Sequence, residues 1–176
     1  MPRTLRLACL LLGAALCCVS TAAQSSAFVG IPVTGTLSEP NGGSGTFSGT
    51  VDVVGFSFAG GHVYATVSLQ GTAITSSGTA VWPPSKTGPL LVIIDGASCD
   101  FLDMHLQTIV IGVSAGGEFY QGTLSSPDRP DGIYVPHITA TNGSIRRTLC
   151  AIASAYARNK VSAIADQLNR LLRQLA

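Results

Sequence analysis

The sequence predicts a mainly β protein, a single antiparallel β-sandwich or barrel with a C-terminal helical segment packed on it. Two observations lead to this fold class. Between residues 24 and 143, short apolar or alternating segments are separated by glycine-rich breaks, and no helical periodicity interrupts them. From residue 144 onward, apolar residues recur at the spacing of an amphipathic helix. We therefore assign a β part to residues 24–143 and a helical part of the same domain to residues 144–176.

Residues 1–23 have the three parts of a secretory signal peptide. Arg3 and Arg6 form the charged start, an apolar run extends from Leu7 to Val19, and small residues at 21–23 provide a cleavage site. The apolar run is shorter than the about 20 residues that a membrane-spanning helix needs. We expect a protein that is secreted or held in the periplasm or cell envelope, without a transmembrane segment.

The first two predicted strands form a hairpin. Phe47 to Phe58 is rich in β-branched and aromatic residues, and His62 to Gln70 alternates between apolar and polar residues after a glycine turn. Leu90 to Ile94 is a continuous apolar run, which is typical of a strand covered on both faces. The alternation predicts one buried face made of Val63, Ala65, Val67 and Leu69.

Three further strands are predicted at Leu102 to Leu106, Thr108 to Val113 and Ile133 to Thr139. Between and around the strands, a short phrase of the form x-Gly-Thr recurs. We interpret this phrase as punctuation at strand edges, because its spacing is too irregular for a structural repeat. Its occurrences begin at Thr34, Ser48, Gln70, Ser77 and Gln121.

The helical part contains two apolar stripes, about a quarter-turn apart around the helix axis. A single straight helix would not keep both stripes on one side, so we expect a break near Asn159. Ser144 is placed to cap the first helix. The first stripe is Ile145, Leu149, Ile152, Ala153 and Tyr156, and the second is Val161, Ile164, Leu168, Leu171, Leu172 and Leu175.

Charge is distributed unevenly along the chain. Residues 24–143 carry eight acidic residues against Lys86 and Arg129, whereas residues 144–176 carry six basic residues against Asp166. An acidic body is a poor partner for nucleic acid, which requires clustered Lys and Arg. The C-terminal helix carries Arg170 and Arg173 opposite its leucines, so it could contact a membrane surface or a protein. We favour the alternative in which the leucines dock on the β part.

Two cysteines remain after the predicted removal of the signal peptide, Cys99 and Cys150. In an exported chain, two cysteines favour a disulfide over a zinc site, which would need four ligands. The alternative is a pair of separate buried thiols. A disulfide that closes a loop of this length stabilises a fold by roughly 4 kcal/mol in the chain-entropy model.

The pattern Gly-x-Ser-x-Gly around Ser114 matches the nucleophile elbow of esterases. Asp128 or Asp131 could serve as the acid and His137 as the base, in the required chain order. An elbow also needs a helix directly after the serine, and residues 118–126 show no helical pattern. We therefore expect Ser114 to belong to a hairpin turn, and we assign no catalytic residue.

Asp103 and His105 share one face of a predicted strand, and Cys99 lies shortly before them. An Asp–His pair could orient a base, and Cys with His could bind a metal. Alternation favours a plain amphipathic strand instead. On this interpretation Leu102, Met104 and Leu106 face inward, while Asp103, His105 and Gln107 face water. We expect no metal and no cofactor.

Two other side chains are weaker candidates. His62 follows a Gly-Gly turn, where polar residues are common. Trp82 precedes Pro83 and Pro84, which predicts an exposed or edge segment with an extended backbone. An aromatic residue there could mark a binding surface, but packing over a loop is the commoner arrangement.

Residues 32–72, PVTGTLSEPNGGSGTFSGTVDVVGFSFAGGHVYATVSLQGT, resemble the first half of a group of small secreted bacterial proteins common in actinobacteria. Those proteins share a strand ending in Gly-Thr, then GTFxGT, a hairpin and a second x-x-Gly-Thr. Cys99 to Leu106 is similar to their Cys-x-hydrophobic-Leu-x-hydrophobic-x-Leu, and residues 137–153 are similar to their strand, glycine turn and LLCAIA. Residues 107–123 depart from the group, whose members usually have GPLxLNLLGLxVxL there.

The resemblance implies a Cys99–Cys150 bond, since the matched cysteines are similarly placed. It also implies that the position of His105 is variable and faces outward, and that the Ser114 motif is no part of the group's pattern. The group has no assigned activity or catalytic residues, so the resemblance implies no reaction.

Three functions are considered. The first is a non-catalytic exported protein that binds at, or forms part of, the cell envelope or an extracellular surface, and we favour it because no convincing acid–base constellation is present. The second is a carrier of a small apolar ligand held in a β cavity between sheet and helix. The third is a serine hydrolase that uses Ser114.

Overall fold

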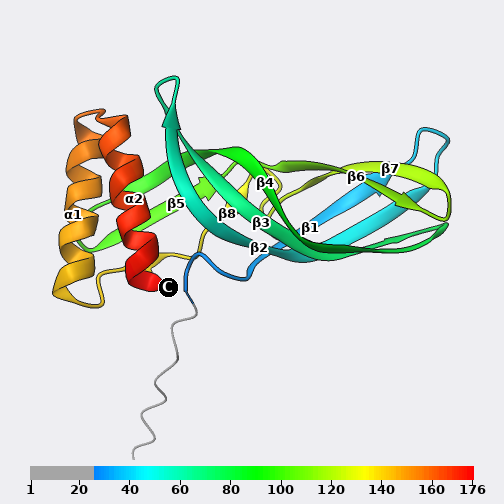
Figure 1. Cartoon of the computed structure of the whole chain (residues 1–176), viewed down its shortest axis with the longest axis horizontal. Coiled ribbons are helices and arrows are strands. Elements are labelled where there is room, and N and C mark those ends of the chain that lie inside the picture. The colour runs from blue at the N-terminus through cyan, green and yellow to red at the C-terminus, as the bar shows by residue number, and fades with distance from the viewer. Residues whose placement is uncertain (1–25) are drawn as a thin grey trace, which may run out of the picture.

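A computed structural model describes residues 26–176, so the predicted signal peptide at 1–23 lies outside the described residues. The described chain is mainly β: one antiparallel sheet with two C-terminal helices packed against it (Figure 1). This confirms the predicted fold class. The strands are β1 Ile31–Ser38, β2 Ser44–Ala59, β3 His62–Thr75, β4 Gly78–Ala97, β5 Phe101–Leu106, β6 Ile109–Ala115, β7 Glu118–Leu124, β8 Ile133–Tyr134 and β9 Ile138–Thr139, and the helices are α1 Gly143–Ala157 and α2 Val161–Leu175.

The strands follow the order β6-β7-β1-β2-β3-β4-β5-β8, and β9 also pairs with β5. Every neighbouring pair is antiparallel. The sheet curls until β6 lies against β4, although no ladder of backbone hydrogen bonds joins these two strands among the described residues. The fold is thus one curled sheet around a continuous apolar core.

The β2–β3 hairpin matches its prediction closely. Val63, Ala65, Val67 and Leu69 are all buried on one face of β3. The expectation that Leu90 to Ile94 is covered on both faces is wrong: Leu90 and Val92 are buried, but Ile93 is 39% exposed. The helices lie beside Val92 and Ile94, so the opposite face of this segment, which carries Ile93, stays partly open to water.

Four of the five recurring Gly-Thr phrases do not mark strand edges, so the interpretation as punctuation is wrong for these four. The fifth contains Gly78, which begins β4. The glycines of the other four lie inside strands β1, β2, β3 and β7, each on the same face as the buried side chains of its strand. A Cβ atom on Gly49 would lie 2.1 Å from the carbonyl oxygen of Gln70, and one on Gly71 would lie 2.6 Å from the Phe47 ring. Glycine is needed here because neighbouring backbones and side chains fill the space of a side chain. The four residues are Gly35, Gly49, Gly71 and Gly122.

The predicted last strand, Ile133 to Thr139, is two short strands, β8 and β9, which both pair with β5. The interruption contains Pro136, which has no backbone N–H to donate to a ladder. The backbone N–H of Val135 still donates to the carbonyl of Met104 at 3.2 Å. The segment therefore follows β5 along its length while residues 135–137 leave the regular ladder.

The predicted helix break is confirmed, because α1 ends at Ala157, α2 begins at Val161, and Asn159 has a positive φ of 52°. The predicted cap is wrong. Asn142, not Ser144, caps α1: its side chain accepts hydrogen bonds from the backbone N–H groups of Ser144 and Ile145, both at 2.9 Å. The Ser144 hydroxyl accepts instead from Gln174 of α2 at 2.8 Å.

Helix α2 docks on the β part through its apolar side, as favoured from the sequence. Ile164, Leu168 and Leu171 are buried, and Asn169 completes the attachment. The Asn169 side chain accepts from the backbone N–H of Phe56 at 2.9 Å and donates to the carbonyl of Phe56 at 2.8 Å. These two bonds satisfy backbone groups next to the bulge at Val53–Gly55, where β2 has passed the end of β1. Among residues 26–176 no helix combines the length and the apolar character needed to cross a membrane.

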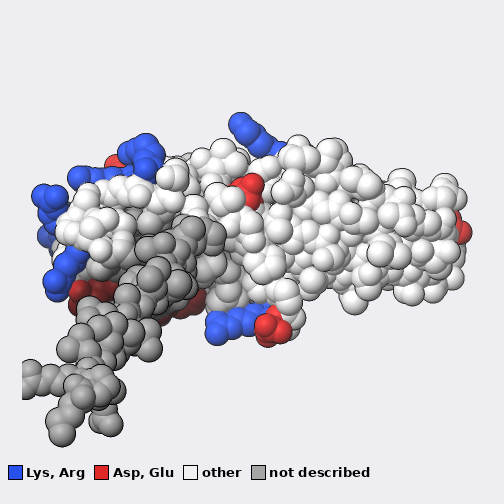
Figure 2. All heavy atoms as spheres, turned by 90° about the horizontal axis from the view of Figure 1, so that it is seen from below, with Lys and Arg blue, Asp and Glu red and all other residues white. Residues whose placement is uncertain are grey.

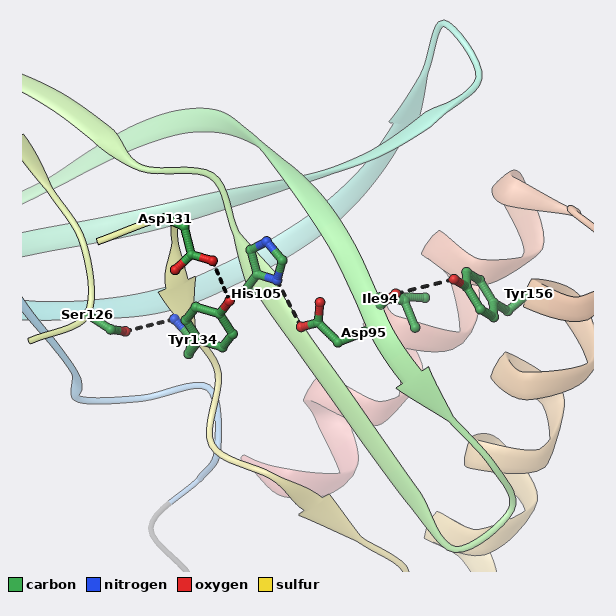
Figure 3. Close-up of polar contacts among 7 residues, drawn as sticks. All are labelled: Ile94, Asp95, His105, Ser126, Asp131, Tyr134 and Tyr156. Carbon is green, nitrogen blue, oxygen red and sulfur yellow. Dashed lines mark hydrogen bonds and ion pairs between the residues drawn. The ribbon is translucent and has the colours of Figure 1, made fainter. Parts of the chain in front are cut away.

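Helix α1 is tied to the sheet by a covalent bond and by a hydrogen bond. A disulfide joins Cys99, in the β4–β5 turn, to Cys150 of α1, at a sequence separation of 51 residues. The Tyr156 hydroxyl donates to the carbonyl of Ile94 in β4 at 3.3 Å (Figure 3). The disulfide interpretation of the two cysteines is therefore the one found in the structure.

Candidate functional site

A polar cavity lies on the outer side of β4 and β5, next to the segment that carries β8. Its volume is about 670 Å³ and it is open to solvent. This volume lies within the roughly 300–1,000 Å³ typical of small-molecule sites. Ionisable groups from three separate parts of the chain meet in it. The lining residues are Asp95, Asp103, Met104, Arg129, Tyr134, Val135, Pro136 and His137.

The first ionisable pair is His105 with Asp95. Strand β4 has a register shift between Ile94 and Gly96, so Asp95 is the extra residue of a β-bulge. The bulge turns the Asp95 carboxylate toward β5, where its oxygen lies 2.8 Å from Nδ1 of His105 (Figure 3). The expectation that His105 faces water is wrong, because only 9% of the residue is exposed.

Tyr134 is the side chain that covers His105. In the β5–β8 ladder the two residues are direct partners, and their rings stack at 4.8 Å between centroids with an interplanar angle of 21°. The Arg129 guanidinium lies 4.2 Å from the centroid of the Tyr134 ring. The loop from Ser126 to Asp131 thus folds back on β5 and closes one side of the cavity.

Tyr134 is also held by two hydrogen bonds (Figure 3). Its backbone N–H donates to the Ser126 hydroxyl at 2.8 Å, and its phenol donates to the Asp131 carboxylate at 2.9 Å. The bond to Asp131, followed by desolvation, raises the pKa of Tyr134 above its usual value of 10.0. The phenol is therefore protonated at neutral pH and holds the loop in place as a donor.

The second ionisable pair is His137 with Asp103. The interruption after β8 carries His137 over β5, where Nδ1 lies 2.6 Å from an Asp103 oxygen. The His137 ring stacks on Phe101 at 5.6 Å with an interplanar angle of 23°. Asp103 and His105 do share a strand face, as the sequence suggested, but each pairs with a residue from another segment.

Both pairs present carboxylate oxygens to the cavity. The side chains of Asp95 and Asp103 are 38% and 43% exposed, and each imidazole bonds to only one of the two oxygens of its carboxylate. The second oxygens can accept hydrogen bonds from a ligand, and the Arg129 side chain supplies donors at the rim. In the described part of the chain, no three His, Cys, Asp or Glu side chains gather closely enough to hold a metal ion. Cys99 is excluded as a ligand because it is oxidised in the disulfide.

Ser114 lies far along the sheet order from these pairs, in β6 just before the Gly116-Gly117 turn. The strand β7 follows the turn directly, so the helix that an elbow needs is absent at this point. Among residues 26–176, Ser114 forms no side-chain hydrogen bond with Asp131, which accepts from Tyr134, or with His137, which pairs with Asp103. The proposed triad is not assembled.

Trp82 and His62 also lie away from the polar cavity. Trp82 is in β4, not in a loop, and packs edge-to-face on Phe47 at 6.5 Å while its indole N–H donates to Ser85 at 2.7 Å. Its ring is therefore part of the packing inside the curled sheet. His62 begins β3 and is exposed, with its ring 6.4 Å from that of Tyr64.

Sequence reasoning missed Asp95, Arg129 and Tyr134 as members of the site. Asp95 ends an apolar run, Arg129 lies in a turn, and Tyr134 lies in a strand, so none forms a motif with the histidines. Only the pairing of β4 and β8 with β5 brings them together. Comparisons of the chain with protein-family models, curated proteins and solved structures found no match.

Proposed function

We propose that the chain is an exported, non-catalytic binding protein of the cell envelope or extracellular space. Its ligand is a small polar molecule rich in hydroxyl or ammonium groups, bound in the cavity between β4, β5 and the Ser126–His137 segment. The observation that carries this proposal is the convergence of two carboxylates, Asp95 and Asp103, and of Arg129 on one open cavity of about 670 Å³, with each carboxylate held by a histidine. The sequence-predicted signal peptide and the disulfide support export, and the sequence resemblance favours a bacterial source.

The ligand class follows from the free acceptors. Asp95 and Asp103 each have an oxygen that no imidazole uses, and both face the cavity. A ligand with several donor groups can bond to both carboxylates at once, while the Arg129 guanidinium can donate to a ligand oxygen. An apolar ligand would leave these charged groups desolvated without partners, at a high energetic cost.

Binding is favoured over catalysis because the pairs lack a nucleophile. In residues 26–176 neither His105 nor His137 forms a hydrogen bond with a serine, threonine or cysteine side chain. The His105 ring is nearly buried under Tyr134, which hinders direct contact with a substrate. The His105–Asp95 pair instead fixes the bulge that presents the carboxylate.

The test is native mass spectrometry of the protein exported by its own host. The wild-type protein should carry a small-molecule adduct. The Asp103→Asn variant and the Arg129→Ala variant should each lose it. Lys86→Ala is the matched control, since Lys86 is an exposed base of β4 outside the cavity, and it should keep the adduct. A wild-type protein that is bare, or an adduct that survives both site substitutions, would overturn the proposal.

A further inference from the structure

A second concave region lies at the junction of sheet and helices, separate from the polar cavity. The turn between β2 and β3 stands beside the turn between α1 and α2 (Figure 1). Two adjoining hollows of about 170 and 450 Å³ occupy this junction and share Gly61, Asn159 and Val161 in their walls. We treat them as one groove, named the junction groove.

The walls of the junction groove are mainly apolar. Val63, Val92 and Ile164 form its buried floor. At the rim, Phe58 is 50% exposed and Tyr156 is 49% exposed, so two large rings stand in solvent beside an apolar floor. Exposed apolar surface gathered in a concavity is typical of a ligand groove.

The charge of the junction groove has one sign. Lys160 lines it and is exposed, and the lining contains no Asp or Glu. Among residues 26–176 Lys160 forms no ion pair. The neighbouring Arg158 adds a second exposed cation, and Lys and Arg gather at this helical end of the molecule (Figure 2). An anionic group at Lys160 would therefore have charge complementarity without competition from a carboxylate of the lining.

We propose that the junction groove binds a single-chain anionic amphiphile such as a fatty acid. Its alkyl chain lies along Phe58, Val161 and the floor of the groove, and its carboxylate lies at Lys160. This chemistry differs from that of the polar cavity, where free carboxylate oxygens would repel an anion. The two sites can therefore be tested independently.

The three histidines of the chain give each site its own reporter. His62 lines the junction groove, whereas His137 lines the polar cavity and His105 bonds to Asp95 in its wall. In an NMR titration with monomeric laurate, we expect the imidazole signals of His62 to shift and saturate at one laurate per chain. The signals of His105 and His137 should not move.

Matched variants and ligands locate the two ends of the amphiphile. Lys160→Glu should weaken laurate binding about tenfold or more, whereas Lys86→Glu, which changes an equivalent exposed base, should not. Octanoate should bind roughly 100-fold more weakly than laurate, because each lost methylene removes buried apolar area. Dodecyltrimethylammonium has the same chain length with the opposite charge, and it should bind at least about tenfold more weakly than laurate.

Phe58→Ser changes a half-exposed ring, so it tests the groove without removing core packing, and it should also weaken laurate binding. The proposal is overturned if laurate produces no saturable shift of His62, if Lys160→Glu binds laurate as the wild type does, or if the cationic amphiphile binds equally well. It is also overturned if the protein binds anionic vesicles but not monomeric laurate, because the groove would then be a membrane contact.

Discussion

The half of the sheet far from the helices differs from the half that carries them. The far half contains β1, β6 and β7, together with the segments of β2 and β3 that lie nearest to these strands. Strands β1, β6 and β7 contain a single charged residue, Glu118. Their close approach depends on inward glycines such as Gly35 and Gly122. The helical half is held by a disulfide, by side-chain bonds to backbone and by two His–Asp pairs. Both proposed ligand sites lie in the helical half.

The comparison shows that the repeated Gly-Thr phrase serves the packing of the strands, whereas the polar cavity is formed by residues that belong to no repeat. The Gly-Thr phrases repeat because each glycine meets the same steric requirement in a different strand. Asp95, His105 and Tyr134 belong to no repeat, and a bulge and two strand pairings bring them together. Four predictions test this division of roles, ordered by expected effect.

The largest effect is expected from removing the disulfide, which holds the helical half. Cys99→Ser should lower the free energy of unfolding by about 4 kcal/mol, because the unfolded chain loses a cross-link over 51 residues. Chemical denaturation measures this value, and Cys150→Ser should give the same result. In hydrogen exchange, protection should fall in α1 before it falls in β1 and β2. Equal loss of protection in both halves would show that they are not distinct.

The second prediction tests the packing of the far half of the sheet. Gly49→Ala should lower the free energy of unfolding by about 3 kcal/mol, because its new Cβ would lie 2.1 Å from a backbone oxygen of β3. Gly55→Ala in the same strand is the control, since its Cβ would meet no atom closer than 3.7 Å. If both variants unfold at the same denaturant concentration, the inward glycines are not needed for packing.

The third prediction tests how the helices are joined to the sheet. Asn169→Ala should lower the free energy of unfolding by about 2 kcal/mol, because it leaves the backbone N–H and carbonyl of Phe56 without partners. Arg173→Ala, an exposed change in the same helix, should alter stability by less than about 0.5 kcal/mol. Similar losses for the two variants would contradict a specific role for the Asn169 amide.

The smallest effect concerns the loop that closes the polar cavity. Asp131→Asn should lower the pKa of Tyr134 toward its usual value, because the carboxylate that accepts from the phenol is removed. In the wild type the raised pKa stabilises the folded state below about pH 10, and this contribution is lost as pH rises through the pKa of the folded protein. Ultraviolet titration of tyrosinate measures the shift, with Tyr134→Phe to assign it. An unchanged titration in Asp131→Asn would show that the bond does not form in solution.

Much of the fold could be predicted from local patterns. Alternation in β3 gave its buried face correctly, and the drift of the apolar stripes gave the helix break at Asn159, because both depend on neighbouring residues. The cap of α1 was missed because Ser144 and Asn142 are both good capping residues, and only the extended backbone at Asn142 decides between them. The exposure of Ile93 could not be predicted, since it depends on which face of β4 the helices cover.

The polar site was predicted only in part, for a physical reason. Asp103 and His105 were recognised as sharing a strand face, but alternation alone placed His105 in water. Burial of His105 results from Tyr134, which pairs with it across β5 and β8. The Asp95 bulge has no local signal in the sequence, because Asp-Gly after an apolar run is equally typical of a turn.

The pairing of each histidine with its own aspartate is the central claim, and the protonated nitrogen of each imidazole tests it most directly. Long-range ¹H–¹⁵N NMR of the neutral histidines distinguishes Nδ1–H from Nε2–H tautomers. Since Nδ1 faces a carboxylate in both pairs, His105 and His137 should carry their proton on Nδ1, while the exposed His62 should not share this preference. Nε2–H tautomers at both His105 and His137 would contradict the pairs and the ligand site built on them.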